Sequence, residues 1–79
     1  MNELMKGELL EIRRDILADY QPTKLSIRAM KFLLDYSNDI PYELQSDLHS
    51  LIAMDMDEFI LPQEQCIEII NKLIAWSLR

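Results

Sequence analysis

The residues of this sequence that are best suited to chemistry are one histidine, one cysteine and a short acidic run. His49 and Cys66 have no second histidine, CxxC pair or glycine-rich nucleophile turn beside them, so the sequence predicts neither a zinc site nor a cysteine nucleophile. The acidic run at residues 55–58 lacks the alternating ligands, glycine and distal glutamate of a calcium loop. We therefore expect no metal site, no cofactor and no enzymatic activity, with His49 on the surface and Cys66 as a small apolar helix residue.

The acidic residues of the chain are concentrated in one region. The 79 residues include 14 Asp and Glu against 8 Lys and Arg, which gives a formal net charge of −6. No Lys or Arg occurs between Lys31 and Lys72. This excess disfavours nucleic acid and anionic lipid as partners, and it favours a positively charged protein surface. The alternative is that these carboxylates only form a solvated face that keeps the protein soluble.

Two tyrosines accompany the carboxylates in the predicted binding surface. Tyr36 and Tyr42 flank the link between the second and third expected helices, and tyrosine offers rigid contact area with a polar tip. Alternatively, Tyr36 closes the core and Tyr42 packs against a helix start. The predicted partner-binding residues are Asp35, Tyr36, Asp39, Tyr42, Glu43, Asp47, Asp55, Asp57 and Glu58.

Helices must position these residues, because the sequence offers little support for strands. It contains one glycine and no long alternation of apolar and polar residues. The prolines at positions 22, 41 and 62 each precede apolar residues at helical spacing, as expected where proline occupies a first helical turn. We predict an all-α fold in one domain, residues 1–79: a compact antiparallel four-helix bundle with short loops. Its helices, each of about four turns or more, start near residues 2, 22, 41 and 62.

The apolar stripes of the second expected helix and the positions of the methionines predict which side chains are buried. Two adjacent apolar stripes run along the second expected helix, so we expect it to be the most buried of the four. Met5 and Met30 are expected to fill the core. Met54 and Met56 flank Asp55 and are candidates for an adaptable apolar contact ringed by carboxylates.

The sequence also bears on the compartment. A lone cysteine cannot form an intramolecular disulfide, which favours a reducing cytoplasm. Residues 1–7 hold acidic and polar side chains and no apolar core of a signal peptide. No apolar run approaches the roughly 20 residues that span a bilayer. We expect a cytoplasmic protein with no membrane partner.

From about Lys31 to Leu78, the order of features resembles the small helical immunity proteins that neutralise secreted bacterial toxins, particularly the MafI-type group or the contact-dependent-inhibition type. The similarity is carried by Phe32-Leu33-Leu34-Asp35-Tyr36, by an acidic helix through Leu44, Leu48 and Ile52, and by Ile60-Leu61-Pro62-Gln63-Glu64. The link after the second helix lacks the glycine of that pattern. The acidic four-helix nuclease immunity proteins are similar in size and charge, but Asp39-Ile40-Pro41-Tyr42 has only one tyrosine of their pair.

The resemblance implies a non-enzymatic protein that binds a toxin domain, often a basic nuclease, and blocks its active site or substrate path. We expect such a protein to be a monomer or a weak homodimer. Two other functions stay open. One is a phage anti-defence or DNA-mimic inhibitor that uses the same acidity. The other is a structural or regulatory module that self-associates through exposed Met and Ile faces.

Overall fold

Four α-helices make up most of residues 3–79, the part of the chain that this computed structural model describes. They are α1 (Glu3–Ala18), α2 (Pro22–Tyr36), α3 (Tyr42–Ile52) and α4 (Gln63–Ser77), with two 3₁₀ turns after α3, η1 (Ala53–Asp55) and η2 (Asp57–Phe59). The described residues contain no strand. The predicted all-α four-helix fold is confirmed, as are the helix starts near residues 22, 41 and 62. The predicted start near residue 2 lies outside the described residues.

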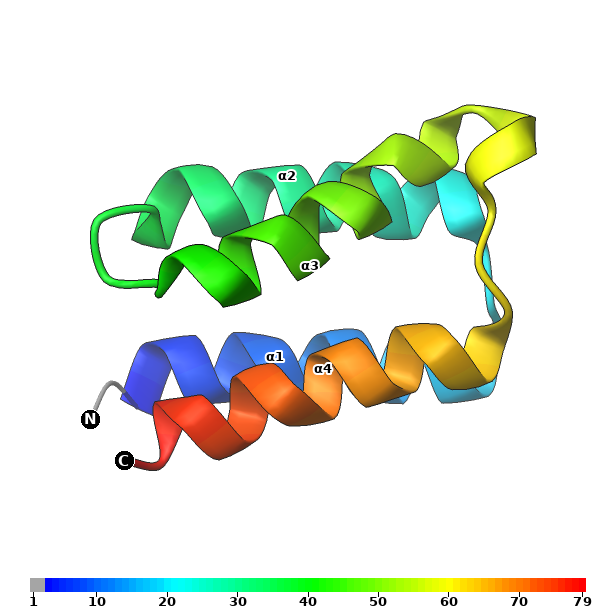
Figure 1. Cartoon of the computed structure of the whole chain (residues 1–79). Helices are drawn as coiled ribbons and strands as arrows, with labels where there is room; N and C mark the ends of the chain where they lie inside the picture. Colours follow the sequence, from blue (N-terminus) through cyan, green and yellow to red (C-terminus); the bar gives the residue numbers. More distant parts are fainter. Residues whose placement is uncertain (1–2) are drawn as a thin grey trace.

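The helices form two antiparallel pairs that pack face to face. In Figure 1, α2 lies beside α3 in one layer and α1 lies beside α4 in the other. The chain runs up and down, so each helix is antiparallel to its neighbours and α4 ends beside the start of α1. The radius of gyration is 11.5 Å, close to the value of about 12 Å expected for a compact domain of this length. No helix in residues 3–79 has the length and apolar character needed to cross a membrane.

The three prolines set the helix starts, as predicted. Pro22 is the first residue of α2, whereas Pro41 and Pro62 directly precede α3 and α4. The carbonyls of Pro41 and Pro62 accept the first backbone hydrogen bonds of their helices, at 3.0–3.2 Å. Glu43 and Glu64 lie in the first turns of these helices, where a carboxylate is stabilised by the helix dipole.

One apolar core joins all four helices. Its buried residues are Met5, Leu9, Ile12 and Ile16 of α1, Leu25, Ala29 and Phe32 of α2, Leu48 and Leu51 of α3, Cys66, Ile69, Ile70, Leu73 and Ile74 of α4, with Ile40 and Met54 from the links. Within each helix these positions recur every three or four residues, which places them on one face. Fully burying each large side chain contributes about 1.5–3 kcal/mol, so this core accounts for most of the stability.

Helix α2 is not the most buried helix, so that prediction was wrong. It buries four residues, whereas α4 buries six. Ile27, Met30 and Leu34 form the second stripe of α2 and are 60%, 44% and 72% exposed. Each helix of a four-helix bundle has neighbours on two sides only, so an outer face stays in solvent whatever residues it carries. Met5 therefore fills the core as predicted, and Met30 does not.

Helix α3 is shorter, and its link to α4 longer, than predicted. It has 11 residues, about three turns, and residues 53–62 connect it to α4. A longer helix would place Asp55 on the face of Leu48 and Leu51, because residues seven positions apart share a face. The chain instead enters η1 and buries Met54, at 1% exposure, while Met56 is 48% exposed. The two methionines therefore do not share one surface contact.

Tyr20 anchors this long link to the bundle. Its hydroxyl donates a hydrogen bond to the Leu61 carbonyl at 2.5 Å and lies 3.3 Å from Cys66 Sγ and 3.6 Å from Met54 Sδ. Burial raises the pKa of the Tyr20 hydroxyl, and the neighbouring Cys66 raises it further. The group therefore remains a protonated donor at neutral pH, and it joins the end of α1 to η1, the link and α4.

Two other side chains bond to carbonyls at helix ends. Ser26 Oγ donates to the Ile52 carbonyl at 2.5 Å, and Gln63 Nε2 donates to the Ile16 carbonyl at 2.7 Å. Carbonyls in the last turn of a helix have no donor within that helix. Side chains of a neighbouring helix supply the donors here, and no residue in the described part of the chain has a positive φ.

Replacing Tyr20 with phenylalanine should lower the free energy of unfolding by about 1–2 kcal/mol, because the half-buried Leu61 carbonyl would lose its donor. The matched control is Tyr42→Phe, whose side chain is 84% exposed and whose effect should stay within about 0.5 kcal/mol. Urea unfolding followed by circular dichroism measures both. Equal stability of the two variants would show that the Tyr20 hydroxyl does not anchor the link.

Candidate functional site

Seven of the nine predicted binding residues fall into two groups at opposite ends of α3. The turn cluster, around the α2–α3 link, consists of Asp35, Asp39, Tyr42 and Glu43. The link cluster, in η1 and η2, consists of Asp55, Asp57 and Glu58. The 11 residues of α3 separate the two by about 16 Å at 1.5 Å per residue. The structure therefore divides the acidic stretch into two surfaces.

The turn cluster lies on a rigid link. Asp39 and Ile40 each donate a backbone hydrogen bond to the Tyr36 carbonyl, and Ile40 is buried at 4% exposure. The amide of Gln45 reaches back to the carbonyls of Ser37 and Ile40, both at 2.9 Å. Because backbone and side chain both hold this turn, the exposed carboxylates of the cluster are presented in a fixed arrangement.

The two predicted tyrosines have different environments. Tyr36 is half-buried, and its ring packs against Phe32 with the ring centres 4.9 Å apart. Burial raises the pKa of Tyr36, and the negative charges of Glu8 and Asp35 raise it further. Tyr42 is 84% exposed and therefore does not pack against the start of α3. Of the two, Tyr42 is the one available to a partner.

Asp47 lies between the two clusters and is compensated by a base. Lys72 Nζ, on α4, is 3.3 Å from Asp47 Oδ2, and the Asp47 side chain is 29% exposed. Lys72 is the first Lys or Arg after Lys31 in the sequence. The antiparallel packing of α3 and α4 nevertheless brings it opposite Asp47, near the middle of the segment between these two lysines. Asp47 is the one predicted carboxylate that has an ion-pair partner in residues 3–79.

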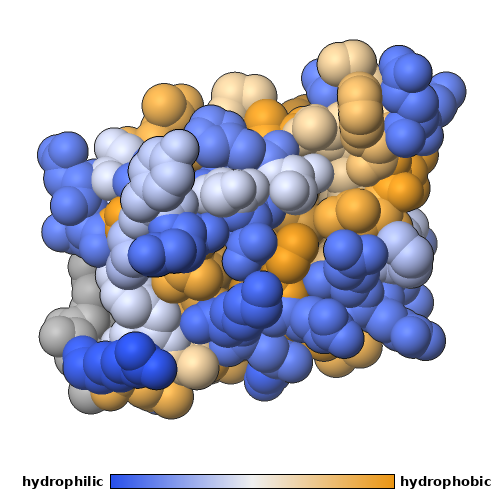
Figure 2. Space-filling view, viewed as in Figure 1, coloured by the Kyte–Doolittle hydropathy of each residue, from blue (hydrophilic) through white to orange (hydrophobic). Residues whose placement is uncertain are grey.

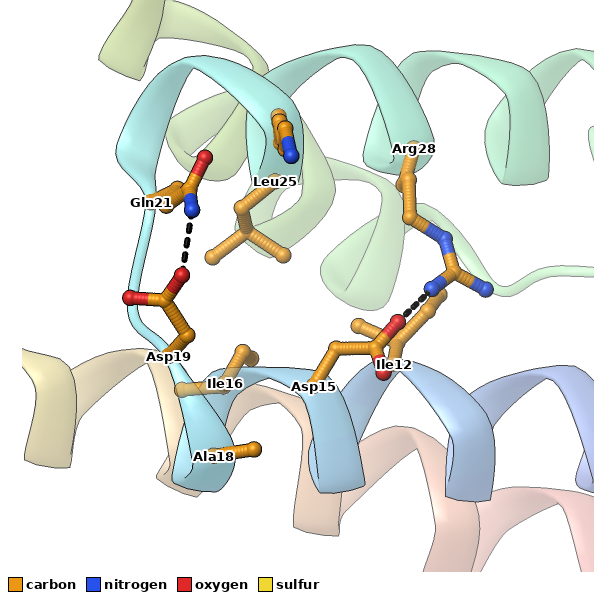
Figure 3. Close-up of a pocket in the computed structure, with 9 residues that line it drawn as sticks. Ile12, Asp15, Ile16, Ala18, Asp19, Gln21, Leu25 and Arg28 are labelled. Carbon is orange, nitrogen blue, oxygen red and sulfur yellow. Dashed lines mark hydrogen bonds and ion pairs between the residues drawn. The ribbon is translucent and has the colours of Figure 1, made fainter.

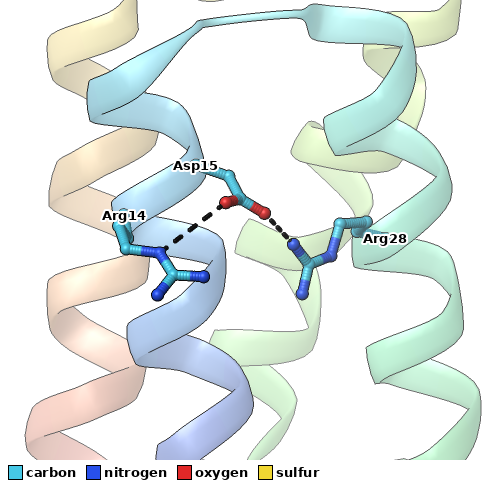
Figure 4. A network of polar contacts seen from close by, with 3 residues as sticks. All are labelled: Arg14, Asp15 and Arg28. Atoms are coloured by element: carbon cyan, nitrogen blue, oxygen red, sulfur yellow. Dashed lines mark hydrogen bonds and ion pairs between the residues drawn. The ribbon is translucent and has the colours of Figure 1, made fainter.

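Arg13 and Arg14 of α1 and Arg28 of α2 make side-chain contacts with residues of α1 and α4, and with no carboxylate of either cluster. Asp15 bridges Arg28 of α2 and Arg14 of α1, the latter at 4.0 Å, as Figure 4 shows. Arg13 donates to Asn71 of α4 at 2.8 Å. Basic side chains are therefore used to hold α1 against α2 and α4, and they do not neutralise the ends of α3.

A small hollow lies between α1 and α2 at the Asp15–Arg28 pair. It has a volume of about 230 Å³ and an apolar lining that includes Ile16 and Leu25. Figure 3 shows the Asp15–Arg28 ion pair at one side of the hollow and the Asp19–Gln21 hydrogen bond at the other. Asp15, Asp19 and Arg28 at its rim are thus bonded within the protein itself.

The link cluster lies beside apolar side chains that the sequence analysis missed. Phe59 and Ile60 are 51% and 43% exposed. Figure 2 shows hydrophobic and strongly hydrophilic surface side by side over the corner where Figure 1 places η1 and η2. The sequence does contain a signal for them: Phe59 and Ile60 stand between the acidic run at residues 55–58 and Pro62, and they do not continue the apolar spacing of either neighbouring helix.

The residues suited to chemistry do not come together in residues 3–79. No group of three or more His, Cys, Asp or Glu residues in the part of the chain described could hold a metal ion. Cys66 is fully buried, and burial raises the pKa of its thiol, partly offset by the hydrogen bond with Tyr20. His49 is exposed on α3, as predicted.

The candidate site is therefore a pair of acidic surfaces, each with an exposed aromatic residue. Tyr42 belongs to the turn cluster and Phe59 lies beside the link cluster. No model of a known protein family, no characterised protein and no solved structure matches the chain.

The Asp47–Lys72 contact should behave as a weak surface ion pair. A double-mutant cycle with Asp47→Asn and Lys72→Met should give a coupling energy of about 0.2–1 kcal/mol in urea unfolding, decreasing as salt screens the charges. The control cycle pairs Lys72→Met with Asp57→Asn, which has no ion pair within residues 3–79, and should give none. A coupling that does not depend on salt would contradict an electrostatic contact.

Proposed function

We propose that this chain is a non-enzymatic binding protein that neutralises a basic toxin domain through its acidic surfaces. One observation carries the proposal: six exposed carboxylates at the ends of α3 have no ion pair or side-chain hydrogen bond within residues 3–79. They are Asp35, Asp39, Glu43, Asp55, Asp57 and Glu58. The order of sequence features, which resembles that of small toxin-immunity proteins, supports the same function.

A basic partner would relieve an unfavourable arrangement of charge. Like charges close together on a small domain repel one another, and no ion pair within residues 3–79 neutralises these six carboxylates. A positive surface turns this repulsion into attraction and speeds the encounter between the two proteins. The exposed rings of Tyr42 and Phe59 add the large rigid contacts that dominate many protein interfaces.

The bundle is suited to block a surface rather than to process a substrate. The backbone around its carboxylates is hydrogen-bonded at both ends of α3, so little backbone ordering opposes binding. A toxin domain that uses a positive surface to bind nucleic acid would lose access to it once that surface is covered. We place this interaction in the cytoplasm, in agreement with the single buried cysteine.

Neutralising part of both clusters should weaken binding far more than neutralising the same number of carboxylates elsewhere. The site variant is Asp39→Asn, Glu43→Gln, Asp57→Asn and Glu58→Gln, and the control variant is Glu3→Gln, Glu11→Gln, Glu64→Gln and Glu68→Gln. Both change the net charge equally. The site variant should bind about 10-fold or more weakly, at roughly 0.2–1 kcal/mol for each contact, and the control by less than about 3-fold.

The partner for this measurement is the protein that cross-linking and mass spectrometry identify in complex with this chain in the cells that produce it, and we expect it to be a basic toxin domain encoded by a neighbouring reading frame. Calorimetric titration across a salt series gives the affinity, and survival of cells that co-express toxin and variant gives the biological effect. The proposal fails if the site variant binds and protects as well as the control at every salt concentration.

Self-association is a second candidate function, favoured by the exposed apolar stripe of α2. Ile27, Met30 and Leu34 lie on one face, and aligned exposed apolar residues are typical of interaction surfaces. If this stripe mediates self-association, sedimentation at micromolar concentration should show a dimer that Ile27→Ser with Leu34→Ser converts to a monomer. A wild-type monomer at these concentrations would exclude the stripe as a stable dimer interface.

A further inference from the structure

A groove lies beside the link cluster, between α3 and η2. The α3 wall is made of Ser46, His49 and Ser50 of α3 with Ala53 of η1, and the opposite wall of residues 58–61, around a volume of about 510 Å³. Three of the four residues of the α3 wall are small, and Ser50 Oγ bonds back to the Ser46 carbonyl of its own helix at 3.3 Å. The α3 wall therefore leaves room for an incoming side chain.

The opposite wall of this groove is held in place and is partly apolar. The Leu61 carbonyl accepts from Tyr20, and the Leu61 N–H points to Met54 Sδ at 3.4 Å. The N–H of Phe59 bonds to the Met56 carbonyl at 3.0 Å. Phe59 and Ile60 are nevertheless about half exposed, so their apolar surface is presented by a fixed backbone.

The charge around the groove is of one sign. Glu58 lines it, Asp55 and Asp57 belong to the same projecting turns, and no Lys or Arg is among the lining residues. All residues from 55 to 60 are exposed, and η1 and η2 project at one corner of the bundle in Figure 1. A partner can therefore approach the apolar wall and the carboxylates at the same time.

We propose that this groove, the Phe59 groove, is the main contact site for the toxin domain of the proposed function. It accepts an apolar side chain of the toxin on a segment that also carries Arg or Lys, whose charges meet Asp55, Asp57 and Glu58. The inference rests on the proposed function and makes it specific. An apolar toxin side chain binds in the groove, toxin bases pair with the carboxylates around it, and the turn cluster contributes less to binding.

The test compares three variants in binding to the toxin domain identified above. Phe59→Ser with Ile60→Ser removes the apolar wall, Ile27→Ser with Leu34→Ser removes comparably exposed residues from α2, and Tyr42→Ser removes the aromatic residue of the turn cluster. Because all positions are exposed, circular dichroism and urea unfolding should show intact folds.

We expect the Phe59/Ile60 variant to bind at least about 10-fold more weakly at every salt concentration, with an unchanged salt dependence, because its charges remain. Asp55→Asn with Asp57→Asn and Glu58→Gln should instead flatten the salt dependence. The α2 and Tyr42 variants should each lose less than about 3-fold, as is usual outside the centre of an interface.

The inference would be overturned if Tyr42→Ser weakened binding more than the Phe59/Ile60 variant did. In that outcome the proposed function would stand, with its main contact at the turn cluster. A wild-type dimer that the Phe59/Ile60 substitutions made monomeric would also overturn it, because a second copy of the chain would occupy the groove. Failure of the proposed function would appear separately, as equal binding by the four-carboxylate site and control variants.

Discussion

The hydrogen bond from Tyr20 to the Leu61 carbonyl is the contact on which the unusual part of this bundle depends. Residues 53–62 form the longest link of the bundle, since the chain must leave α3, turn twice and enter α4. Tyr20, which follows α1, and Cys66 of α4 both contact Met54 within this segment. Their convergence lets η1 and η2 project while their backbone stays ordered.

This anchoring connects the fold to the proposed function. A projecting turn with acidic and apolar side chains would lose conformational entropy on binding if it were free to move. Here the backbone of the turn is already ordered in the folded protein, through contacts at Leu61 and the burial of Met54, so binding would remove less conformational entropy. The same logic holds at the other end of α3, where Gln45 fixes the link to α2. Both acidic surfaces thus lie on backbone that is held by contacts within the bundle, which suits the proposed binding of a partner.

The fold was largely predictable because its determinants are local. The prolines at 22, 41 and 62 mark three helix starts through their own backbone restrictions, and apolar spacing of three and four residues places the core positions of α1 and α4. The candidate site was predictable only in composition. Its residues are acidic and exposed, but nothing in the spacing shows that Asp47 meets Lys72 or that Phe59 and Ile60 line a groove. Those facts depend on residues far apart in the chain.

The sequence by itself determined where α2, α3 and α4 begin, that the fold is all-α and that acidic charge accumulates after Lys31, because each follows from near neighbours in the chain or from composition. Only the tertiary structure decided which apolar stripe of α2 is buried, since both stripes suit a core and the packing against α1 and α3 selects one. It also divided the acidic stretch in two. The carboxylates of this stretch stand at opposite ends of α3, and Lys72 of α4 reaches Asp47 between them.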